Sequence, residues 1–575
     1  MNFVFSRSPR GHILRCGMLA VLAAITAFSV PTIQVSAQER LSPGGGSAVA
    51  GATDPVLVVT LSSINQLTQD INYISGAVGQ PQAGGIFAMM AATFTQGIDT
   101  NQPIGIVVPL VDGAPEPIAL IPTPDIKVVL KRLEAQTGPA DELDDGTLVL
   151  AIGANTVFIR QTGSWAVLAR NRQVLDAAPA DPSGLLSEDA ANYDLALRLD
   201  MQQIPADTRD ALIAQLRQGF DQALSRQQGE QAEATRKMAE GSFEQIEQII
   251  GQTDDLAIGI DIDSLGRQVG LEIEFTALPG TDLAKLYEGQ KPIASQFRSV
   301  IRDDAAAYFH GAASVGPETV EQARGSIDQI MQMARQAISS EDRLTPDQQE
   351  DAANMVERIV DLIVASYAEG KFDAGAVLNT SGGQLEFVFG AFVKDGNEAA
   401  KIVQDIADKV KNETDAPRFE FNRDTYNGVT MHMIEADVPA SEDEVQKIFG
   451  EAVRVHIGTG ATTVYVALGD ASVPALKRLI DTAATPQPAG DSLLSQLQVK
   501  LLPIMQFAQG IENNDVISAM IDALARAADG GKLSVQSEVI DNGTITRVTL
   551  GDGLLQAIGA ASRQAQAAQM QQGQF

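Results

Sequence analysis

Aliphatic and polar residues alternate along two adjacent stretches near the middle of the chain. Leucine or isoleucine occupies every second position over 256–262, and large apolar residues do so again over 269–275. This period of two is typical of β-strands with one apolar and one polar face. A turn over 264–266 separates the stretches, and Thr281 is placed to cap a short helix after the second. The sequence from Asp254 to Gly289 therefore predicts a β-hairpin that leads into a helix.

This hairpin belongs to an order of elements (strand, helix, helix, hairpin, helix) that the sequence predicts four times. The copies begin near Val56, Tyr193, Ala305 and Leu497, and their hairpins cover 104–121, 256–276, 372–393 and 533–550. The last hairpin has the clearest signal, because Asn542-Gly543 is the preferred pair of a two-residue type I′ turn. In the third copy, a helix is expected to open at Thr345-Pro346, where Gln348 completes a capping box.

Additional strands and a helix follow the first and third copies, over 147–178 and 429–484. Within them, residues 164–169 match residues 463–468. The simplest account is a tandem duplication, with 54–290 as one half and 300–563 as the other. About eight inward side chains of a hairpin do not offset the conformational entropy of some twenty ordered residues, so other elements must cover the hairpins. We predict an α+β fold in which helices pack on antiparallel sheets in two related halves.

The first 37 residues have the features of a secretory signal peptide. Three arginines precede an apolar run over 18–30, and Val35-Ser36-Ala37 provides a cleavage site. The run is too short for a membrane span, and no later stretch reaches about 18 uninterrupted apolar residues. We therefore expect cleavage after Ala37 and a secreted or periplasmic protein without a transmembrane segment. The only cysteine, Cys16, would be removed, which leaves the mature chain without a disulfide.

Two further segments are expected outside the folded halves. Residues 38–53 contain a glycine-serine run and predict a flexible linker. Residues 564–575 are rich in glutamine, so they can extend the last helix but are expected to fray.

The predicted mature chain is strongly acidic. Without Arg7, Arg10 and Arg15 it has 38 basic and 73 acidic residues, a net charge of −35. Such a surface repels nucleic acid and anionic lipid headgroups. The acids are spread along the chain, and hydrophobic residues make up 45% of it. We therefore interpret the charge as the acidic surface of a folded protein and not as a sign of disorder.

No motif in the sequence predicts catalysis. We find no phosphate-binding loop, dinucleotide fingerprint, nucleophile elbow or zinc-protease helix, and Ser314 lies between glycines at the wrong spacing for an elbow. The mature chain lacks a cysteine for thiol chemistry. Its three histidines, His310, His432 and His456, lie in predicted strands and are expected to be structural. We assign no catalytic, cofactor-binding or metal-binding residue.

Three patterns still deserve a test against the structure. Asp261, Asp263, Gly266, Val269 and Glu272 occupy positions 1, 3, 6, 9 and 12 of a calcium loop of the EF-hand type. Leu265 stands at position 5, where an oxygen ligand is required, and the flanks have the period of strands, so we expect a plain turn.

The other two patterns are an adjacent carboxylate pair and a single tryptophan. Asp254 and Asp255 could act as acid and base in a hydrolase, although 73 acidic residues make such pairs common by chance. Trp165 could mark a ligand site, but its strand is rich in valine and alanine, which favours a core position.

The exported start, the repeated units and segments such as 271–286 (LEIEFTALPGTDLAKL) resemble a family of uncharacterised secreted bacterial proteins that share a domain of unknown function. The resemblance covers most of the mature chain and implies neither an activity nor site residues.

The sequence leaves three functional interpretations open. The first is a non-catalytic binding or scaffolding protein of the cell envelope, in which a sheet and amphipathic helices enclose an apolar ligand, somewhat as in periplasmic lipoprotein carriers. The second is an assembly protein that acts through contacts with other envelope proteins. The third is the carboxylate hydrolase. We expect no cofactor and no nucleic-acid partner.

Overall fold

The computed structural model describes residues 54–572, apart from residue 154 and the segments 226–245, 322–330, 332–333, 336–337, 339–344, 381–382, 411–416, 490–492 and 512–514. The described residues form two compact units. The N-terminal unit contains 54–284 together with Ile540–Arg563, and the C-terminal unit contains Lys285–Val539 together with the chain from Gln564. The predicted signal peptide and the predicted linker lie outside the described residues.

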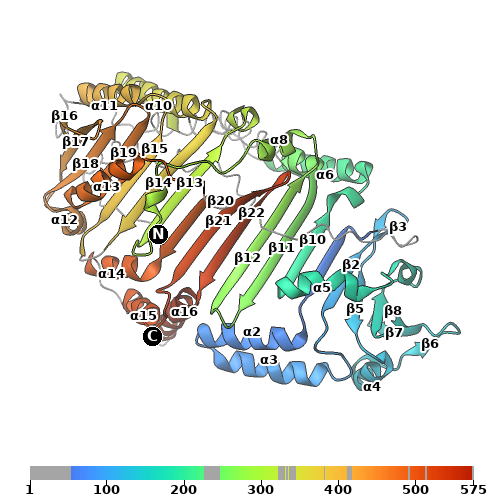
Figure 1. Cartoon of the computed structure of the whole chain (residues 1–575). Coiled ribbons are helices and arrows are strands. Elements are labelled where there is room, and N and C mark those ends of the chain that lie inside the picture. The colour runs from blue at the N-terminus through green and yellow to red at the C-terminus, as the bar shows by residue number, and fades with distance from the viewer. Residues whose placement is uncertain are drawn as a thin grey trace. The chain divides into compact units, whose positions relative to one another are not determined.

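In the N-terminal unit, one antiparallel sheet runs through the described strands (Figure 1). In sheet order the strands are β22 (Gly543–Gly551), β12 (Gln268–Ala277), β11 (Thr253–Asp263), β10 (Leu195–Asp200), β1 (Leu57–Leu61), β2 (Ile104–Val108), β5 (Ile118–Pro122), β9 (Trp165–Ala169), β8 (Asn155–Thr162), β7 (Leu148–Ile152) and β6 (Asp141–Glu142). A separate short ribbon pairs β3 (Leu110–Val111) with β4 (Ala114–Pro115).

The helices of this unit include α2 (Ile64–Ala77), α3 (Pro81–Phe94), α4 (Ile126–Thr137), α5 (Pro182–Asn192), α6 (Ala206–Ser225) and α16 (Asp552–Gln572), with 3-10 turns η2 (Gln173–Ala177) and η3 (Met201–Gln203). Ser63 caps α2 by accepting a hydrogen bond from the Gln66 amide, and Asp125 caps α4 in the same way through Lys127. The short helix α8 (Asp282–Glu288) follows β12, as predicted.

Two apolar clusters form the core of the N-terminal unit. In the first, α5 and η2 cover β1, β2, β5 and β9, and Trp165 lies inside it with only 5% of its surface exposed, which confirms its predicted core position. In the second, α4 packs on β7, β8 and β9 through Ile126, Val129 and Leu130. A Cβ on Gly105 would lie 2.6 Å from Leu186 Cδ1, so this glycine lets α5 approach the sheet closely.

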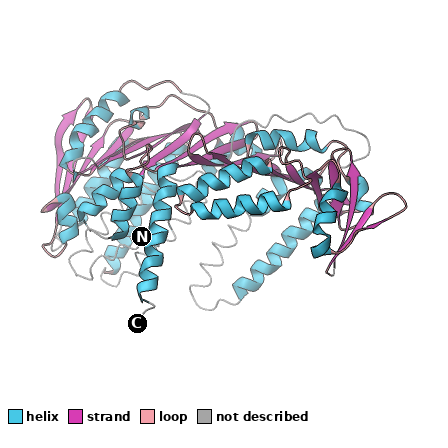
Figure 2. Cartoon of the chain, turned by 90° about the horizontal axis from the view of Figure 1, so that it is seen from below, coloured by secondary structure: helices cyan, strands magenta, loops and turns pink. Residues whose placement is uncertain are grey.

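In the C-terminal unit the described strands again pair antiparallel. In sheet order its described strands are β21 (Lys532–Ile540), β20 (Leu493–Lys500), β13 (Ala307–Ser314), β14 (Lys371–Asn379), β15 (Glu386–Phe392), β19 (Thr463–Leu468), β18 (Ala452–Thr459), β17 (Val429–Asp437) and β16 (Arg418–Tyr426). Its helices are α10 (Pro346–Tyr367), α11 (Gly396–Val410), α12 (Asp443–Phe449), α13 (Val473–Ala483), α14 (Leu501–Ile511) and α15 (Asp515–Leu524), with 3-10 turns η4 (Arg298–Val300) and η6 (Asp470–Ser472). Helices flank the strands of the chain (Figure 2).

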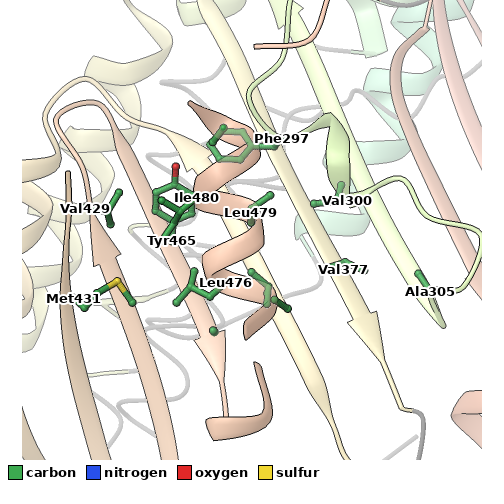
Figure 3. Close-up of a cluster of buried hydrophobic side chains, with 14 residues drawn as sticks. Phe297, Val300, Ala305, Val377, Val429, Met431, Tyr465, Leu476, Leu479 and Ile480 are labelled. Carbon is green, nitrogen blue, oxygen red and sulfur yellow. The ribbon is translucent and has the colours of Figure 1, made fainter. Parts of the chain in front are cut away.

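Phe297 is the centre of the C-terminal core (Figure 3). It is fully buried, and Leu476, Leu479 and Ile480 of α13 pack with it over β14, β15 and β19. A Cβ on Gly390 would lie 2.6 Å from the Phe297 ring, and a Cβ on Gly375 would lie 2.9 Å from Phe297 Cβ, so Phe297 rests directly on two glycines of neighbouring strands. The capping box predicted at Thr345 and Gln348 is confirmed at the start of α10.

The α+β class and the antiparallel pairing are thus confirmed. The compact units have other bounds than the predicted halves, because 285–290 belongs with the C-terminal unit and Ile540–Arg563 with the N-terminal unit. The physical reason is that β22 pairs with β12 over nine residue pairs. No described helix is long and apolar enough to span a membrane.

Candidate functional site

One face of the N-terminal sheet carries apolar side chains across six neighbouring strands. The pairing of β2, β1, β10, β11, β12 and β22 places residues directly opposite one another in rows that share a face. The three rows are Ile106, Val59, Leu197, Ile258, Ile273 and Thr546; Ile104, Leu61, Leu195, Ile260, Leu271 and Val548; and Val108, Leu57, Leu199, Leu256, Phe275 and Thr544. We call these rows the aliphatic face.

The aliphatic face is only partly covered. Phe275 and the two threonines of β22 are buried, but every other side chain in the three rows is half-buried or exposed. Ile106 retains 43% of its accessible surface and Leu195 retains 36%. The sequence led us to expect that other elements cover the hairpin of β11 and β12. On the apolar side of this hairpin the cover is incomplete. A continuous apolar surface of this size is typical of an interaction or ligand site.

The opposite face of these strands is the apolar core under α5 at β1 and β2, and it becomes polar over β10, β11 and β12. Arg198 donates a 2.5 Å hydrogen bond to Asp189, which also accepts one from Thr60. Tyr193 donates to Glu272, and Glu272 also faces Arg547 on β22. A Cβ on Gly259 would lie 2.4 Å from the Tyr193 ring, so this glycine makes room for the tyrosine.

Titratable groups on this polar face have shifted pKa values. Burial raises the pKa of Glu274 to about 7, and Arg198 only partly offsets that effect. The cavity between these groups has a volume of about 10 Å³ and is lined by Asp189, Tyr193, Arg198, Glu272 and Glu274, among others. That volume is close to the minimum for a single water molecule. Glu274 has the pKa of a general acid, but the cavity has no room for a substrate beside it.

The carboxylates Asp254 and Asp255, considered above for a hydrolase, lie where β11 begins. Asp255 pairs across the sheet with Asp200. Burial, followed by the charges of Asp200 and Asp254, raises the pKa of Asp255 to about 6, and burial also raises the pKa of Asp254. Neither residue lines the small cavity. The pair is thus part of a three-carboxylate cluster, and nothing in its geometry singles out an acid and a base.

A second buried carboxyl group joins α2 to the sheet. Asp70 is fully buried, and burial together with a hydrogen bond to Asp194 raises its pKa well above the ordinary value. Asp194 also accepts hydrogen bonds from the Ser62 hydroxyl and from the Ile262 amide at 2.6 Å. A proton shared between the two carboxyls lets them lie together, so this contact fixes α2 at the end of β10 and β11.

The C-terminal unit brings a serine, a histidine and an aspartate together, which sequence spacing did not reveal. Ser295 Oγ donates a 2.6 Å hydrogen bond to Asp373 Oδ1, and His310 Nε2 lies 2.9 Å from the same Oγ. In a catalytic triad the histidine lies between the other two residues, whereas here the serine does. All three side chains are buried, and burial lowers the pKa of His310 to about 4. The group therefore anchors the segment before β13.

The other predicted candidates are separate from one another. His432 contacts Thr459 on β18, and His456 pairs with Asp470 at 3.0 Å. They lie on adjacent strands but face opposite sides of the sheet, since His432 is opposite Ile457 and His456 is opposite Met433. Ser314 Oγ donates to the Gly289 carbonyl at 2.6 Å and has a structural role at the end of β13.

The loop with calcium-like spacing is a turn between strands. Asp261 and Asp263 lie on β11 and Glu272 lies on β12, where it contacts Tyr193 and Arg547. Leu265 is 96% exposed at the tip. Asp263 accepts a 2.6 Å hydrogen bond from the Gly266 amide, so it closes the turn itself.

A surface cleft of about 450 Å³ lies at the other end of this unit. Its walls are Gly97, Ile98, Asp99, Gln102, Pro122, Pro124, Ser164 and Ser183. These residues come from the loops after α3, β5 and β8 and from the first turn of α5. The cleft contains one carboxylate and two hydroxyls, but its lining includes no histidine, lysine or second carboxylate that would pair with them as acid or base. It is therefore a recess without a catalytic pair.

Comparison with known proteins adds no assignment. No family model, curated protein or solved structure gives a significant match to the chain. The aliphatic face, the widest apolar surface that the described strand pairing creates in either unit, is therefore the leading candidate site.

Proposed function

We propose that this chain is an exported, non-catalytic protein that binds an apolar ligand, such as a lipid acyl chain, on its aliphatic face. The observation that carries the proposal is the set of fifteen half-buried or exposed aliphatic side chains in three rows across β2, β1, β10, β11, β12 and β22. Covering such side chains stabilises a complex by about 25 cal/mol for each Å² of apolar surface removed from water. A flat row of aliphatic groups also matches an extended hydrocarbon chain, which needs no hydrogen-bond partner.

Neighbouring positions on the same strand allow a matched test. Ile258→Ser changes the aliphatic face, and Ala257→Ser places the same new residue on the polar face one position away. Binding of a fluorescent fatty acid, cis-parinaric acid, should weaken by about tenfold in Ile258→Ser, in line with the transfer energy of one lost aliphatic side chain, and stay unchanged in Ala257→Ser. Native mass spectrometry of the exported protein should show a bound hydrophobic molecule.

Two outcomes would contradict this function. One is wild-type protein that does not bind the fatty acid, and the other is equal binding by the two variants. Oligomers that grow with protein concentration and lack ligand would instead favour the assembly function.

Export is part of the proposal and has its own measurement. The intact mass of the protein recovered from outside the cytoplasm should correspond to a chain that starts at Gln38, because Val35 and Ala37 have the small side chains that signal peptidase accepts. Recovery of the full Met1 chain in that fraction would contradict it.

We further propose that the two sheets descend from one duplicated unit, and the strand orders support this. The order β11, β10, β1, β2, β5, β9, β8, β7, β6 has the same chain connections as β21, β20, β13, β14, β15, β19, β18, β17, β16. The sequence match of 164–169 with 463–468 aligns Val167, which lies in the core under α5, with Val466, whereas the neighbouring Tyr465 lies in the core under α13. The match is therefore shifted by one residue from the buried faces of β9 and β19, because a shift of one exchanges the two faces of a strand.

A further inference from the structure

Helix α3 presents a stripe of large apolar side chains to solvent. Ile86, Met89, Met90 and Phe94 are 54%, 65%, 47% and 54% exposed. Ile86, Met90 and Phe94 follow one another at intervals of four residues, and Met89 lies three residues after Ile86, which places all four on one side of the helix. The only buried residue of α3 is Gly84, where a Cβ would overlap Ser75 and Asn72 of α2. The helix is therefore held by its partner α2 on one side while its apolar residues point outward.

The charge pattern distinguishes this stripe from the rest of the surface. The whole chain has a net charge of −32, yet no charged residue occurs between Asp70 and Asp99. The last turns of α2, the whole of α3 and the start of the loop after it thus form an uncharged segment of an acidic protein. An apolar phase can cover it without removing an ionised group from water.

Basic side chains lie at both ends of the stripe. Arg132 of α4 donates a hydrogen bond to the Thr93 carbonyl at 3.3 Å, one residue before Phe94. Arg563 of α16 donates to the Val78 carbonyl at 2.7 Å, just before α3 begins. Among the described residues, neither guanidinium is paired with a carboxylate. Exposed Lys131 precedes Arg132 on the same helix.

Helix α4 extends the apolar surface beyond α3. Val128 is 49% exposed, and a Cβ on Gly97, in the loop after α3, would lie 3.4 Å from Val128 Cγ1. The loop thus brings the end of the stripe against α4, which also carries Lys131 and Arg132.

We propose that this surface, comprising the stripe of α3 with Val128, Lys131, Arg132 and Arg563, docks on a phospholipid bilayer. The apolar side chains would enter the boundary between headgroups and acyl chains, and the basic groups would meet lipid phosphates. A second copy of the chain is a poorer occupant, because two acidic surfaces repel each other and offer no phosphate to the basic groups. Zwitterionic lipids fit best, since they present phosphates without a net negative surface charge. The stripe contains no residue of the aliphatic face, so this proposal does not depend on the ligand site.

Vesicle flotation with the full mature protein tests the proposal. Wild-type protein should float with vesicles of phosphatidylcholine and phosphatidylethanolamine. The double variant Met89→Ser/Phe94→Ser should bind these vesicles at least about tenfold more weakly. Leu265→Ser is the matched control, because Leu265 is a 96% exposed aliphatic residue elsewhere in the same unit. This control should float like the wild type. Lys131→Gln/Arg132→Gln should lower binding by a smaller factor.

Further readouts separate membrane docking from misfolding and from ligand binding. Trp165 is the only tryptophan and lies in the core of this unit, so an unchanged fluorescence unfolding curve shows that a variant is folded. The Met89→Ser/Phe94→Ser protein should still bind cis-parinaric acid. The proposal is overturned if wild-type protein fails to float, if the double variant floats equally well, or if the double variant also loses fatty-acid binding. It is also overturned if the stripe holds two copies of the chain together in solution without vesicles.

Discussion

The two units have the same order of strands, but different side chains cover the faces of their sheets. In the N-terminal unit, the rows across β2, β1, β10 and β11 consist of leucine, isoleucine and valine. In the C-terminal unit, the corresponding rows across β14, β13, β20 and β21 are Leu378, Ala307, Val499 and Leu533; Ala376, Phe309, Leu497 and Val535; and Ala374, Gly311, Ser495 and Ser537. Small and polar residues interrupt the apolar surface there. A broad aliphatic face is thus a property of one unit and not a requirement of the fold.

The opposite faces differ as well. In the C-terminal unit, Phe297 fills the space over Gly375 and Gly390, and Ser295, His310 and Asp373 form a closed hydrogen-bonded group. In the N-terminal unit, Leu186 covers Gly105, and beyond it the face is lined with carboxylates and arginines. The comparison indicates that dense packing closes this face in the C-terminal unit, whereas carboxyl groups whose pKa is raised by burial line it in the N-terminal unit.

We expect the largest loss of stability when either of the two side chains that cover these glycines, Phe297 and Leu186, is truncated. Phe297→Ala should destabilise the protein by about 3–5 kcal/mol, and Leu186→Ala by about 2–5 kcal/mol, because both leave a cavity against glycines that cannot fill it. Denaturant unfolding checks this, with circular dichroism for the whole chain and Trp165 fluorescence for the N-terminal unit. Leu186→Ala should shift the fluorescence transition more than Phe297→Ala does. Equal shifts of that transition would show that the two units unfold together.

Replacing the glycines under these side chains with alanine should lower stability by a smaller amount, and the loss should differ between the two units. A Cβ on Gly390 would meet the rigid Phe297 ring at 2.6 Å and Leu479 at 3.1 Å, so Gly390→Ala should cost about 1–3 kcal/mol. A Cβ on Gly105 would meet only the ends of the flexible Leu186 side chain, so Gly105→Ala should cost less. Urea unfolding of both variants measures the difference. A larger loss in Gly105→Ala would contradict the view that the C-terminal core is the more tightly packed one.

The sequence revealed much of this fold because its signals are local. Alternation predicted the β11–β12 hairpin, and the Thr345-Pro346 capping box predicted the start of α10. The rows of the aliphatic face depend on pairing between strands far apart in the chain, such as Val59 with Leu197, and alternation alone does not specify partners. The pairing of β22 with β12 was missed for the same reason. His310 and Asp373 are 63 positions apart, and only the pairing of β13 with β14 brings them near Ser295.

Stability should respond to pH differently in the two units. Glu274 has a pKa of about 7 in the folded N-terminal unit against an ordinary value of 4.5, and Asp255 has about 6 against 3.8. A raised carboxyl pKa means that the folded state binds the proton more tightly, so this stabilisation is complete below about pH 4 and is lost as pH rises to about 7. The Trp165 transition should therefore move to lower denaturant between pH 5 and pH 7 in the wild type. Glu274→Gln should flatten that dependence.

The C-terminal unit should show a weaker response over the same range, because two groups act in opposite directions. Burial raises the pKa of Asp373 to about 6, so its contribution falls as pH rises. Burial lowers the pKa of His310 to about 4 from an ordinary 6.5, so its contribution is present above about pH 6.5 and is lost as pH falls. Hydrogen exchange of peptides from β13 and β14 measures this unit separately. A steep loss of protection there between pH 5 and pH 7 would show that Asp373 dominates.

The smallest expected effect concerns the hairpin turns, where calcium should change nothing. The turn between β11 and β12 has calcium-like spacing, whereas only Asp541 and Asn542 separate the end of β21 from the start of β22. Glu272 would have to leave Tyr193 and Arg547 to reach a cation in the first turn, and Leu265 supplies no oxygen. Two aspartates held on a flat strand cannot replace those ligands. Calorimetric titration of the mature protein with micromolar calcium should therefore give no saturable heat, and Glu272→Gln should give the same trace. Saturable binding that the substitution abolishes would show that the hairpin can rearrange into a metal loop, and it would give the N-terminal sheet a cation site on the face opposite its aliphatic face.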